Sequence, residues 1–204
     1  IISFLTEFPR AKILSSESCY QACDAQINMT GVNGGTPSYL YSINGGSPQN
    51  SSTSGFLCGD QWHEITAIDA NGCSISDSVF IVGPDPLTFN ANVTSNLIYN
   101  GFGVSCNGSS DGEITFSNIL GGTPNYSYAW TGPFVNGINT QDLDGISAGA
   151  YTLEVIDGNG CTVVQQFLIQ QSGCTESMAC NYDPEATLND GSCTYIESGE
   201  CDCD

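Results

Sequence analysis

The sequence has very little positive charge. Arg10 and Lys12 are its only cationic side chains apart from the titratable His63, against 22 Asp and Glu, so the net charge of the 204 residues is −20. A chain without a basic patch repels phosphate backbones, which argues against nucleic-acid binding and against anionic lipid surfaces. No lysine follows Lys12, so lysine–asparagine isopeptide cross-links are excluded from most of the chain.

Histidine is also scarce. His63 is the single histidine, so a Ser/His/Asp or Cys/His arrangement has only one candidate base. We interpret His63 as a packed or solvent-facing strand residue. The carboxylates of Asp142 and Asp144 are close enough in sequence to suggest a hydrolytic pair, but residues 141–145 read as a loop. We therefore predict no catalytic residue and no enzymatic activity.

Long apolar runs are missing as well. No stretch approaches the roughly 18 apolar residues that a membrane-spanning helix needs, so we expect no membrane insertion in this segment. No signal peptide is visible, and residues 1–5 lack an initial Met and resemble a strand entered midway. We expect the sequence to be a fragment of a longer protein.

Two motifs each occur twice. Gly-Gly-Thr-Pro stands at 34–37 and, 87 residues later, at 121–124, while Asn-Gly-Cys stands at 71–73 and, 88 residues later, at 159–161. Two motifs that recur at nearly one offset indicate a duplicated module, and tandem modules more often serve reach, display or multivalent contact than catalysis. The predicted parts are a divergent first module over 1–84, a second module over 85–171, and an acidic cysteine-rich tail over 172–204 that continues beyond the fragment.

The modules have the sequence pattern of β-strands. Residues 113–117, 126–130 and 151–155 alternate polar with apolar side chains, the period of a half-buried strand. Asn159-Gly160 between two alternating runs favours a tight hairpin. Six or seven short strands per module, without helical periodicity, predict an all-β fold with two tandem immunoglobulin-like Greek-key β-sandwiches and a small disulfide-rich irregular tail. Trp130 and Tyr128 are then core residues, the alternative being an aromatic platform for a sugar.

Eleven cysteines in such a chain indicate an oxidising compartment. Zinc binding would call for C-x₂-C pairs or histidine partners, and neither occurs. Cysteines at equivalent positions of the two modules are expected to bond within each module, and the two unmatched cysteines of module one are expected to bond to each other. The predicted pairs are Cys19–Cys73, Cys106–Cys161 and Cys23–Cys58.

The tail holds the other cysteines, whose pairing the sequence leaves open. They are Cys174, Cys180, Cys193, Cys201 and Cys203. An odd number requires a partner beyond Asp204, a partner in another chain, or a free thiol.

A group of oxygen-bearing side chains in the tail suggests calcium as the one candidate cofactor. The proposed metal ligands are Asp183, Glu185, Asn189 and Asp190. Calcium binds several oxygen ligands, but no D-x-D-x-D-G loop is present. The alternative is that Asp183-Pro184 and Asn189-Asp190-Gly191 form Asx turns without metal.

Residues 106–161 carry three strings in succession: C-x-G-x-x-D-G-x-I, G-G-T-P-x-Y-x-Y-x-W and A-G-x-Y-T-L-x-V-x-D-x-N-G-C. This pattern resembles the SprB repeat, found in very large surface adhesins of Bacteroidota, including those used in gliding motility. Module one departs from it, because Ile43 replaces the tryptophan and Trp62-His63 disturbs the A-G-x-Y stretch. The tail is similar to the "GCTDPxACNYDPxATxDDGSC" segments common in secreted proteins of the same phylum.

The resemblance implies an extracellular, cell-surface filament exported by the type IX pathway. We therefore expect a non-catalytic structural or interaction segment of a large adhesin, whose partners are neighbouring repeats of the same chain, surface polysaccharide or other filament subunits. The alternative is a carbohydrate-binding module that uses loops at one end of the sandwich, such as residues 132–136. The resemblance also makes Ser78, within Asp77-Ser78-Val79, a candidate for O-glycosylation.

Overall fold

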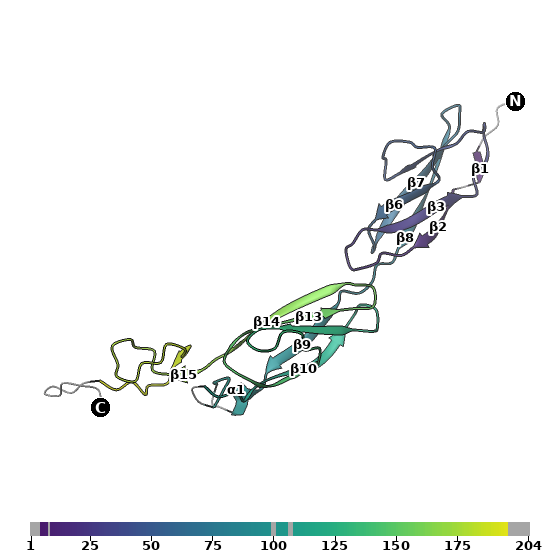
Figure 1. Ribbon diagram of the computed structural model, residues 1–204. Coiled ribbons are helices and arrows are strands. Elements are labelled where there is room, and N and C mark those ends of the chain that lie inside the picture. Colours follow the sequence, from purple (N-terminus) through teal and green to yellow (C-terminus); the bar gives the residue numbers. More distant parts are fainter. Residues whose placement is uncertain (1–4, 8, 99–100, 106–107, 196–204) are drawn as a thin grey trace. The chain divides into compact units, whose positions relative to one another are not determined.

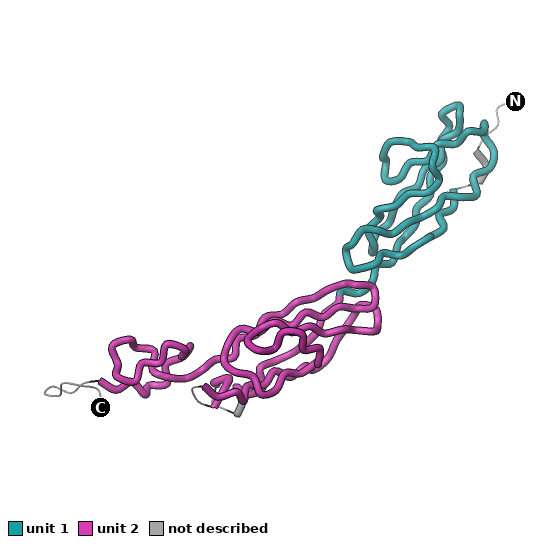
Figure 2. The backbone as a smooth tube through the Cα atoms, in the orientation of Figure 1, with its two compact units in different colours: residues 1–86 teal, residues 87–204 magenta. Residues whose placement is uncertain are grey.

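The computed structural model describes residues 5–7, 9–98, 101–105 and 108–195 (Figure 1). The chain divides into two compact units, unit 1 over residues 1–86 and unit 2 over residues 87–204 (Figure 2). The cysteine-rich tail falls within the second unit by this division, so the three-part organisation stays a prediction.

Unit 1 contains two three-stranded antiparallel sheets and one short strand pair. The first sheet has the order β2 (Arg10–Ser15), β3 (Ala25–Thr30), β6 (Thr53–Leu57). The second has the order β5 (Leu40–Ile43), β7 (Gln61–Ile68), β8 (Ser74–Ile81). The short pair is β1 (Leu5–Glu7) with β4 (Asn33–Gly34).

Unit 2 repeats the two sheets in the same chain order. One sheet has the order β12 (Leu143–Ile146), β10 (Gly112–Leu120), β9 (Thr88–Val93), and the other has the order β11 (Ser127–Thr131), β13 (Gly149–Ile156), β14 (Thr162–Ile169). It adds a single helical turn, α1 (Ser95–Ile98), and a parallel pair in the tail, β15 (Ser172–Gly173) with β16 (Leu188–Asn189). When the short pair β1 and β4 is left out, each unit has six sandwich strands. The first, second and fourth of these along the chain form one sheet, and the third, fifth and sixth form the other. This is an immunoglobulin-like arrangement, and it confirms the predicted all-β sandwich fold.

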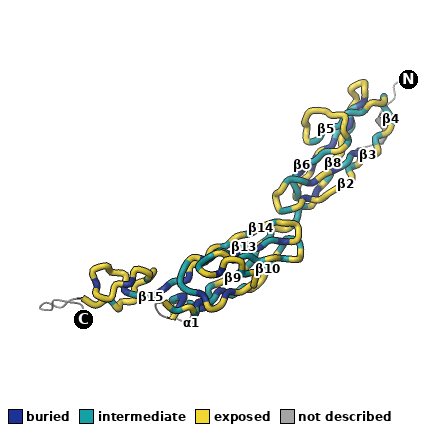
Figure 3. Tube along the Cα trace, in the orientation of Figure 1, coloured by how far each residue is buried: buried dark blue, intermediate teal, exposed yellow. Residues whose placement is uncertain are grey.

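Each unit buries its own core between its two sheets (Figure 3). The core of unit 2 contains two large side chains, Trp130 and Tyr151, both almost fully buried. The Trp130 indole N–H donates to the carbonyl of Thr140 at 3.0 Å, so Trp130 is a satisfied core residue and not a sugar platform. Tyr128 is partly buried and packs against that core. Unit 1 has a smaller, mainly aliphatic core.

The hairpins β7–β8 and β13–β14 have the same register relative to their turns. Ile68 pairs with Ser74, and Ile156 pairs with Thr162, immediately beside the two Asn-Gly-Cys turns. The alternation predicted for residues 151–155 is observed on β13, whose inward side chains are buried. The expectation that residues 141–145 form a loop is wrong from Leu143 onward, because Leu143–Ile146 pairs with β10 as strand β12.

Candidate functional site

The two repeated motifs meet at a buried aspartate in unit 1. Asp69, at the end of β7, accepts a hydrogen bond on Oδ2 from the N–H of Thr36 in the Gly-Gly-Thr-Pro loop, at 2.9 Å. Its Oδ1 accepts the N–H groups of Asn71 and Cys73 in the hairpin turn, each at 2.9 Å. One carboxylate therefore closes the turn and ties it to a loop more than 30 residues away.

Asp157 makes the equivalent bonds in unit 2. Its Oδ2 accepts from the N–H of Thr123 at 2.8 Å, and its Oδ1 accepts from Asn159 at 2.9 Å and Cys161 at 2.8 Å. Both aspartates are buried. We refer to each set as the aspartate joint of its unit.

Hydrogen bonding keeps both joint carboxylates ionised. The N–H of Thr36, helped by those of the turn, lowers the pKa of Asp69 below its ordinary value. Burial raises the pKa of Asp157, but the backbone N–H groups of Thr123 and of its turn outweigh that effect, and the net direction is downward. An acidic group that stays deprotonated and whose oxygens already accept backbone bonds is suited to holding a fold, not to proton transfer.

The histidine is also part of the framework. His63 is buried on β7, where Nδ1 accepts from the Asn44 amide at 3.0 Å and Nε2 donates to the Cys58 carbonyl at 2.9 Å. Tyr151 occupies the same place on β13, and its hydroxyl donates to the Ser147 carbonyl at 2.8 Å. His63 thus replaces the tyrosine that ties the strand to the preceding corner in sandwich folds of this kind. Of the two placements expected for His63, packed or solvent-facing, the structure shows the packed one.

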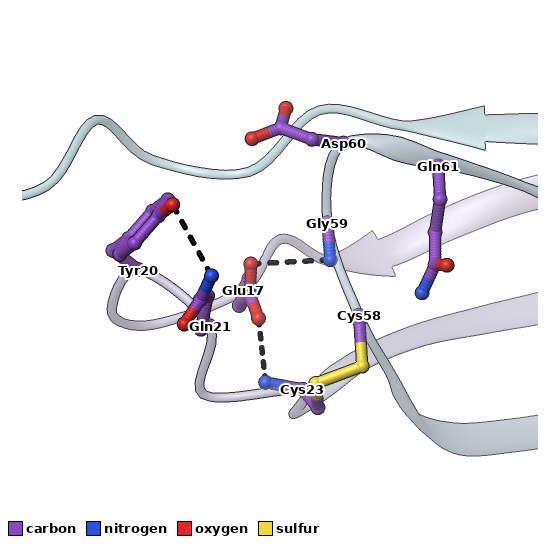
Figure 4. Close-up of a pocket in the computed structure, with 8 residues that line it drawn as sticks. All are labelled: Glu17, Tyr20, Gln21, Cys23, Cys58, Gly59, Asp60 and Gln61. Carbon is purple, nitrogen blue, oxygen red and sulfur yellow. Dashed lines mark hydrogen bonds between the residues drawn. A yellow bond between two sulfur atoms is a disulfide. The ribbon is translucent and has the colours of Figure 1, made fainter.

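A cavity in unit 1 is lined in part by the Cys23–Cys58 disulfide. It has a volume of about 480 Å³ and is lined by Glu17, Tyr20, Gln21, Cys23, Cys58, Gly59, Asp60 and Gln61 (Figure 4). The buried Glu17 carboxylate lies between two segments, accepting the N–H of Cys23 on Oε1 and the N–H of Gly59 on Oε2. Because both oxygens are occupied by backbone donors, Glu17 braces the loop and is not a free acid or base.

The disulfide pattern agrees with one sequence prediction and overturns another. Cys23 and Cys58 are bonded as predicted. The predicted Cys19–Cys73 bond is wrong, because Cys73 is a free, exposed thiol and Cys19 is bonded elsewhere.

Strand length explains this correction. Tyr20 and Gln21 line the same cavity as Gln61 at the start of β7, whereas Cys73 follows the other end of that strand. Eight residues of strand span about 24 Å, and a disulfide requires Cα atoms within about 7 Å.

The other predicted cysteine bonds are described only in part. Cys161 is disulfide-bonded, but Cys106 lies outside the described residues, so the Cys106–Cys161 pair stays a prediction. In the tail, Cys174 bonds to Cys193 and Cys180 is also disulfide-bonded. Cys201 and Cys203 lie outside the described residues.

Three of the four proposed calcium ligands accept hydrogen bonds within the tail, and calcium binding stays a prediction. Asp183 is buried and accepts the Glu185 N–H at 3.0 Å and the Gln171 amide at 2.9 Å. Asn189 accepts the Gly191 N–H at 3.0 Å, and Asp190 accepts the Ser192 N–H at 2.9 Å. Within the described residues, no three His, Cys, Asp or Glu side chains gather into a possible metal site. The bonds from the N–H groups of Glu185, Gly191 and Ser192 are those of Asx turns.

The remaining candidates are dispersed. Asp142 accepts the Phe116 N–H at 2.7 Å, and Asp144 is exposed on β12. Ser78 is exposed on β8, the edge strand of its sheet, and its glycosylation is untested. Phe134, in the loop over 132–136, is 98% exposed. In the part of the chain that the structure describes, no helix has the length and apolarity to cross a membrane.

Three features were not anticipated from the sequence. They are the aspartate joints, the Glu17 brace and a surface pair formed by Trp62 and Phe80. The sequence did contain a signal for the aspartate joints, because the two motifs that form them recur together at nearly one offset. The sequence also contained a signal for the surface pair. Trp62 and Phe80 are equally far from the hairpin turn, so they lie opposite each other on the two strands.

Comparison with known proteins supports the repeat assignment. No curated protein matches the chain with significant similarity. The model of one family, described as the SprB repeat, matches residues 104–133, which begin after α1 and include β10 and β11. SprB repeats are structural repeats associated with proteins of the cell surface. Residues 104–133 of unit 2 are therefore similar to the SprB repeat.

Proposed function

We propose that the chain is a non-catalytic structural segment of a large extracellular adhesin or surface filament. The observation that carries this proposal is the aspartate joint, formed by the same atoms in both units. The residues that the duplication repeats are thus used to hold turns and loops in place. When the residues that two modules share serve to hold the fold, the modules are suited to extending a chain and displaying other parts of it.

The cell-surface location rests on two further observations. Disulfides are formed in both units, as expected of a protein in an oxidising compartment. The SprB match associates the segment with surface proteins, including adhesins of gliding cells. The high negative charge keeps an exposed filament soluble and away from anionic surfaces.

Labelling of intact cells tests this function. Antibodies against the 204-residue chain should decorate unpermeabilised cells, and electron microscopy should place the label on thin surface fibres. Label found only after permeabilisation would contradict the proposal.

A second candidate function is carbohydrate binding through the loop at residues 132–136. The observation in its favour is Phe134, whose ring is 98% exposed and whose backbone has φ of 59°, a conformation that non-glycine residues seldom adopt. Loss of glycan binding in Phe134→Ala would support this candidate.

A further inference from the structure

The outer face of the β5–β7–β8 sheet in unit 1 carries an exposed aromatic pair. Trp62 on β7 lies directly opposite Phe80 on β8, with ring centroids 5.4 Å apart and planes tilted by 59°. Trp62 is 67% exposed and Phe80 is 39% exposed. Most of the indole surface therefore remains open to solvent, and core packing does not explain its presence.

Polar side chains continue the same face along the two strands. Glu64 pairs with Ser78, and Thr66 pairs with Ser76, with a hydrogen bond of 2.8 Å between the Thr66 and Ser76 hydroxyls. On β7, Glu64 and Thr66 alternate with buried residues, as Trp62 does. The two polar pairs therefore lie on the same side of the sheet as the aromatic pair. Successive rows are about 7 Å apart. The Trp62 face is defined here by Trp62, Glu64, Thr66, Ser76, Ser78 and Phe80.

Unit 2 shows that the fold does not need this face. Its equivalent hairpin, with the same register, pairs Ala150 with Leu168 at the position of Trp62 and Phe80. The next row is Thr152 with Gln166. Because the same architecture forms with an alanine there, the indole of unit 1 is an addition to the sandwich and not a requirement of it.

We propose that the Trp62 face binds a neutral polysaccharide. The C–H groups of a pyranose ring carry slight positive charge and pack on the electron-rich face of an indole. The serine and threonine hydroxyls and the Glu64 carboxylate can exchange hydrogen bonds with sugar hydroxyls. A few placed polar groups beside an aromatic contact are the usual composition of a small-ligand site.

Charge and size select this ligand class over others. The face carries a carboxylate and no cation, and the chain has a net charge of −20, so uronic-acid and sulfated polymers are repelled. A stable protein interface buries about 800 Å² on each partner. The Trp62 face, with two aromatic rings and a few short polar side chains, is too small to bury that area. The inference is independent of the filament role and of the 132–136 loop.

The test uses the full 204-residue chain, produced without glycosylation so that Ser78 is unmodified. The probes are dextran, laminarin, xylan, galactomannan and agarose as neutral polymers, with alginate as the anionic control. Migration through gels containing each polymer measures binding. Tryptophan fluorescence reports the site independently, because Trp130 is buried and Trp62 is the exposed indole. Binding should retard migration and shift the emission to shorter wavelength with at least one neutral polymer, and alginate should do neither.

The variants Trp62→Ala and Phe80→Leu give unit 1 the residues that unit 2 already accommodates at these positions, so folding should persist and circular dichroism checks it. Each variant should weaken binding by about tenfold or more, as for other aromatic stacking contacts. Leu168→Ala, at the exposed equivalent position of unit 2, is the matched control and should bind normally. Phe134→Ala tests the loop over 132–136 in the same assay. The proposal is overturned by failure of all five neutral polymers to bind, by unchanged binding in Trp62→Ala, or by loss of binding in Phe134→Ala alone.

Discussion

Thr123 and Asp157 are joined by a hydrogen bond of 2.8 Å from the threonine N–H to the aspartate carboxylate. Thr36 and Asp69 are joined in the same way in the other unit, at 2.9 Å. The Gly-Gly-Thr-Pro and Asn-Gly-Cys motifs are therefore two halves of one joint. This explains why they recur together, since either half without the other leaves buried donors or a buried carboxylate unpaired.

Asp157→Ala should destabilise unit 2. The substitution leaves the N–H groups of Thr123, Asn159 and Cys161 without their acceptor, and hydrogen bonds to a charged group contribute about 1.5–3 kcal/mol to stability. We expect a loss of about 2 kcal/mol or more in the free energy of unfolding, measured by urea denaturation. The matched control is Asp144→Asn on exposed β12, which should change stability by less than about 0.5 kcal/mol. Equal effects of the two variants would contradict the joint.

The joints also predict a loss of stability in acid. The pKa values of Asp69 and Asp157 are lower in the folded chain than the ordinary value of 3.8. The unfolded chain therefore binds more protons in this range. The contribution of both groups is complete above the ordinary pKa and is lost as pH falls through the folded pKa. Urea midpoints should fall from about pH 5 to about pH 2, and the fall should be smaller in Asp157→Asn. A midpoint that is equally pH-dependent in wild type and variant would refute this assignment.

Much of the fold follows from local sequence because its signals are local. Alternation over 151–155 and the Asn159-Gly160 turn determine a hairpin without reference to the rest of the chain. Trp130 is large and mostly apolar, so its own side chain predicts a place in the core without reference to other segments. Strand β12 was missed because its short run, Leu143-Asp144-Gly145-Ile146, contains a bulge with Gly145 at φ of 66° and does not alternate.

The site-level features depend on distances between segments, which the sequence does not give directly. Duplication shows that Cys19 corresponds to Cys106, but correspondence between modules says nothing about proximity within one. Cys19 and Cys73 each have an equivalent cysteine in the other module, yet they lie near opposite ends of β7. His63 likewise has no local signal for its bond to Cys58, because that bond depends on how the preceding corner packs.

The Cys23–Cys58 bond should contribute strongly to the stability of unit 1. It closes a loop of 35 residues, which corresponds to about 4 kcal/mol in the chain-entropy treatment of disulfides. The double variant Cys23→Ser/Cys58→Ser should lower the unfolding transition of unit 1 and leave unit 2 unchanged. Cys73→Ser serves as control and should have little effect, since that thiol is free and exposed. A double variant as stable as the control would contradict this role.

Cys73 should react with thiol reagents in the native protein. Its side chain is exposed at the hairpin tip and unbonded, whereas Cys23 and Cys58 are held in a disulfide. Iodoacetamide added without denaturant should modify the peptide that contains Cys73, and mass spectrometry after digestion locates the label. Cys23 and Cys58 should be labelled only after reduction. Recovery of a Cys19–Cys73 disulfide peptide from unreduced protein would show this prediction to be wrong.

Removal of calcium should leave the tail unchanged. Asp183, Asn189 and Asp190 already accept backbone N–H groups, and the Ser192 hydroxyl and N–H lower the pKa of Asp190 without any cation. Excess EDTA should therefore not shift the melting temperature of the 204-residue chain, and added calcium should not raise it. Reduction of the Cys174–Cys193 bond is the positive control, because it should loosen the same segment. A rise in melting temperature that depends on calcium concentration would contradict this expectation and support the metal site.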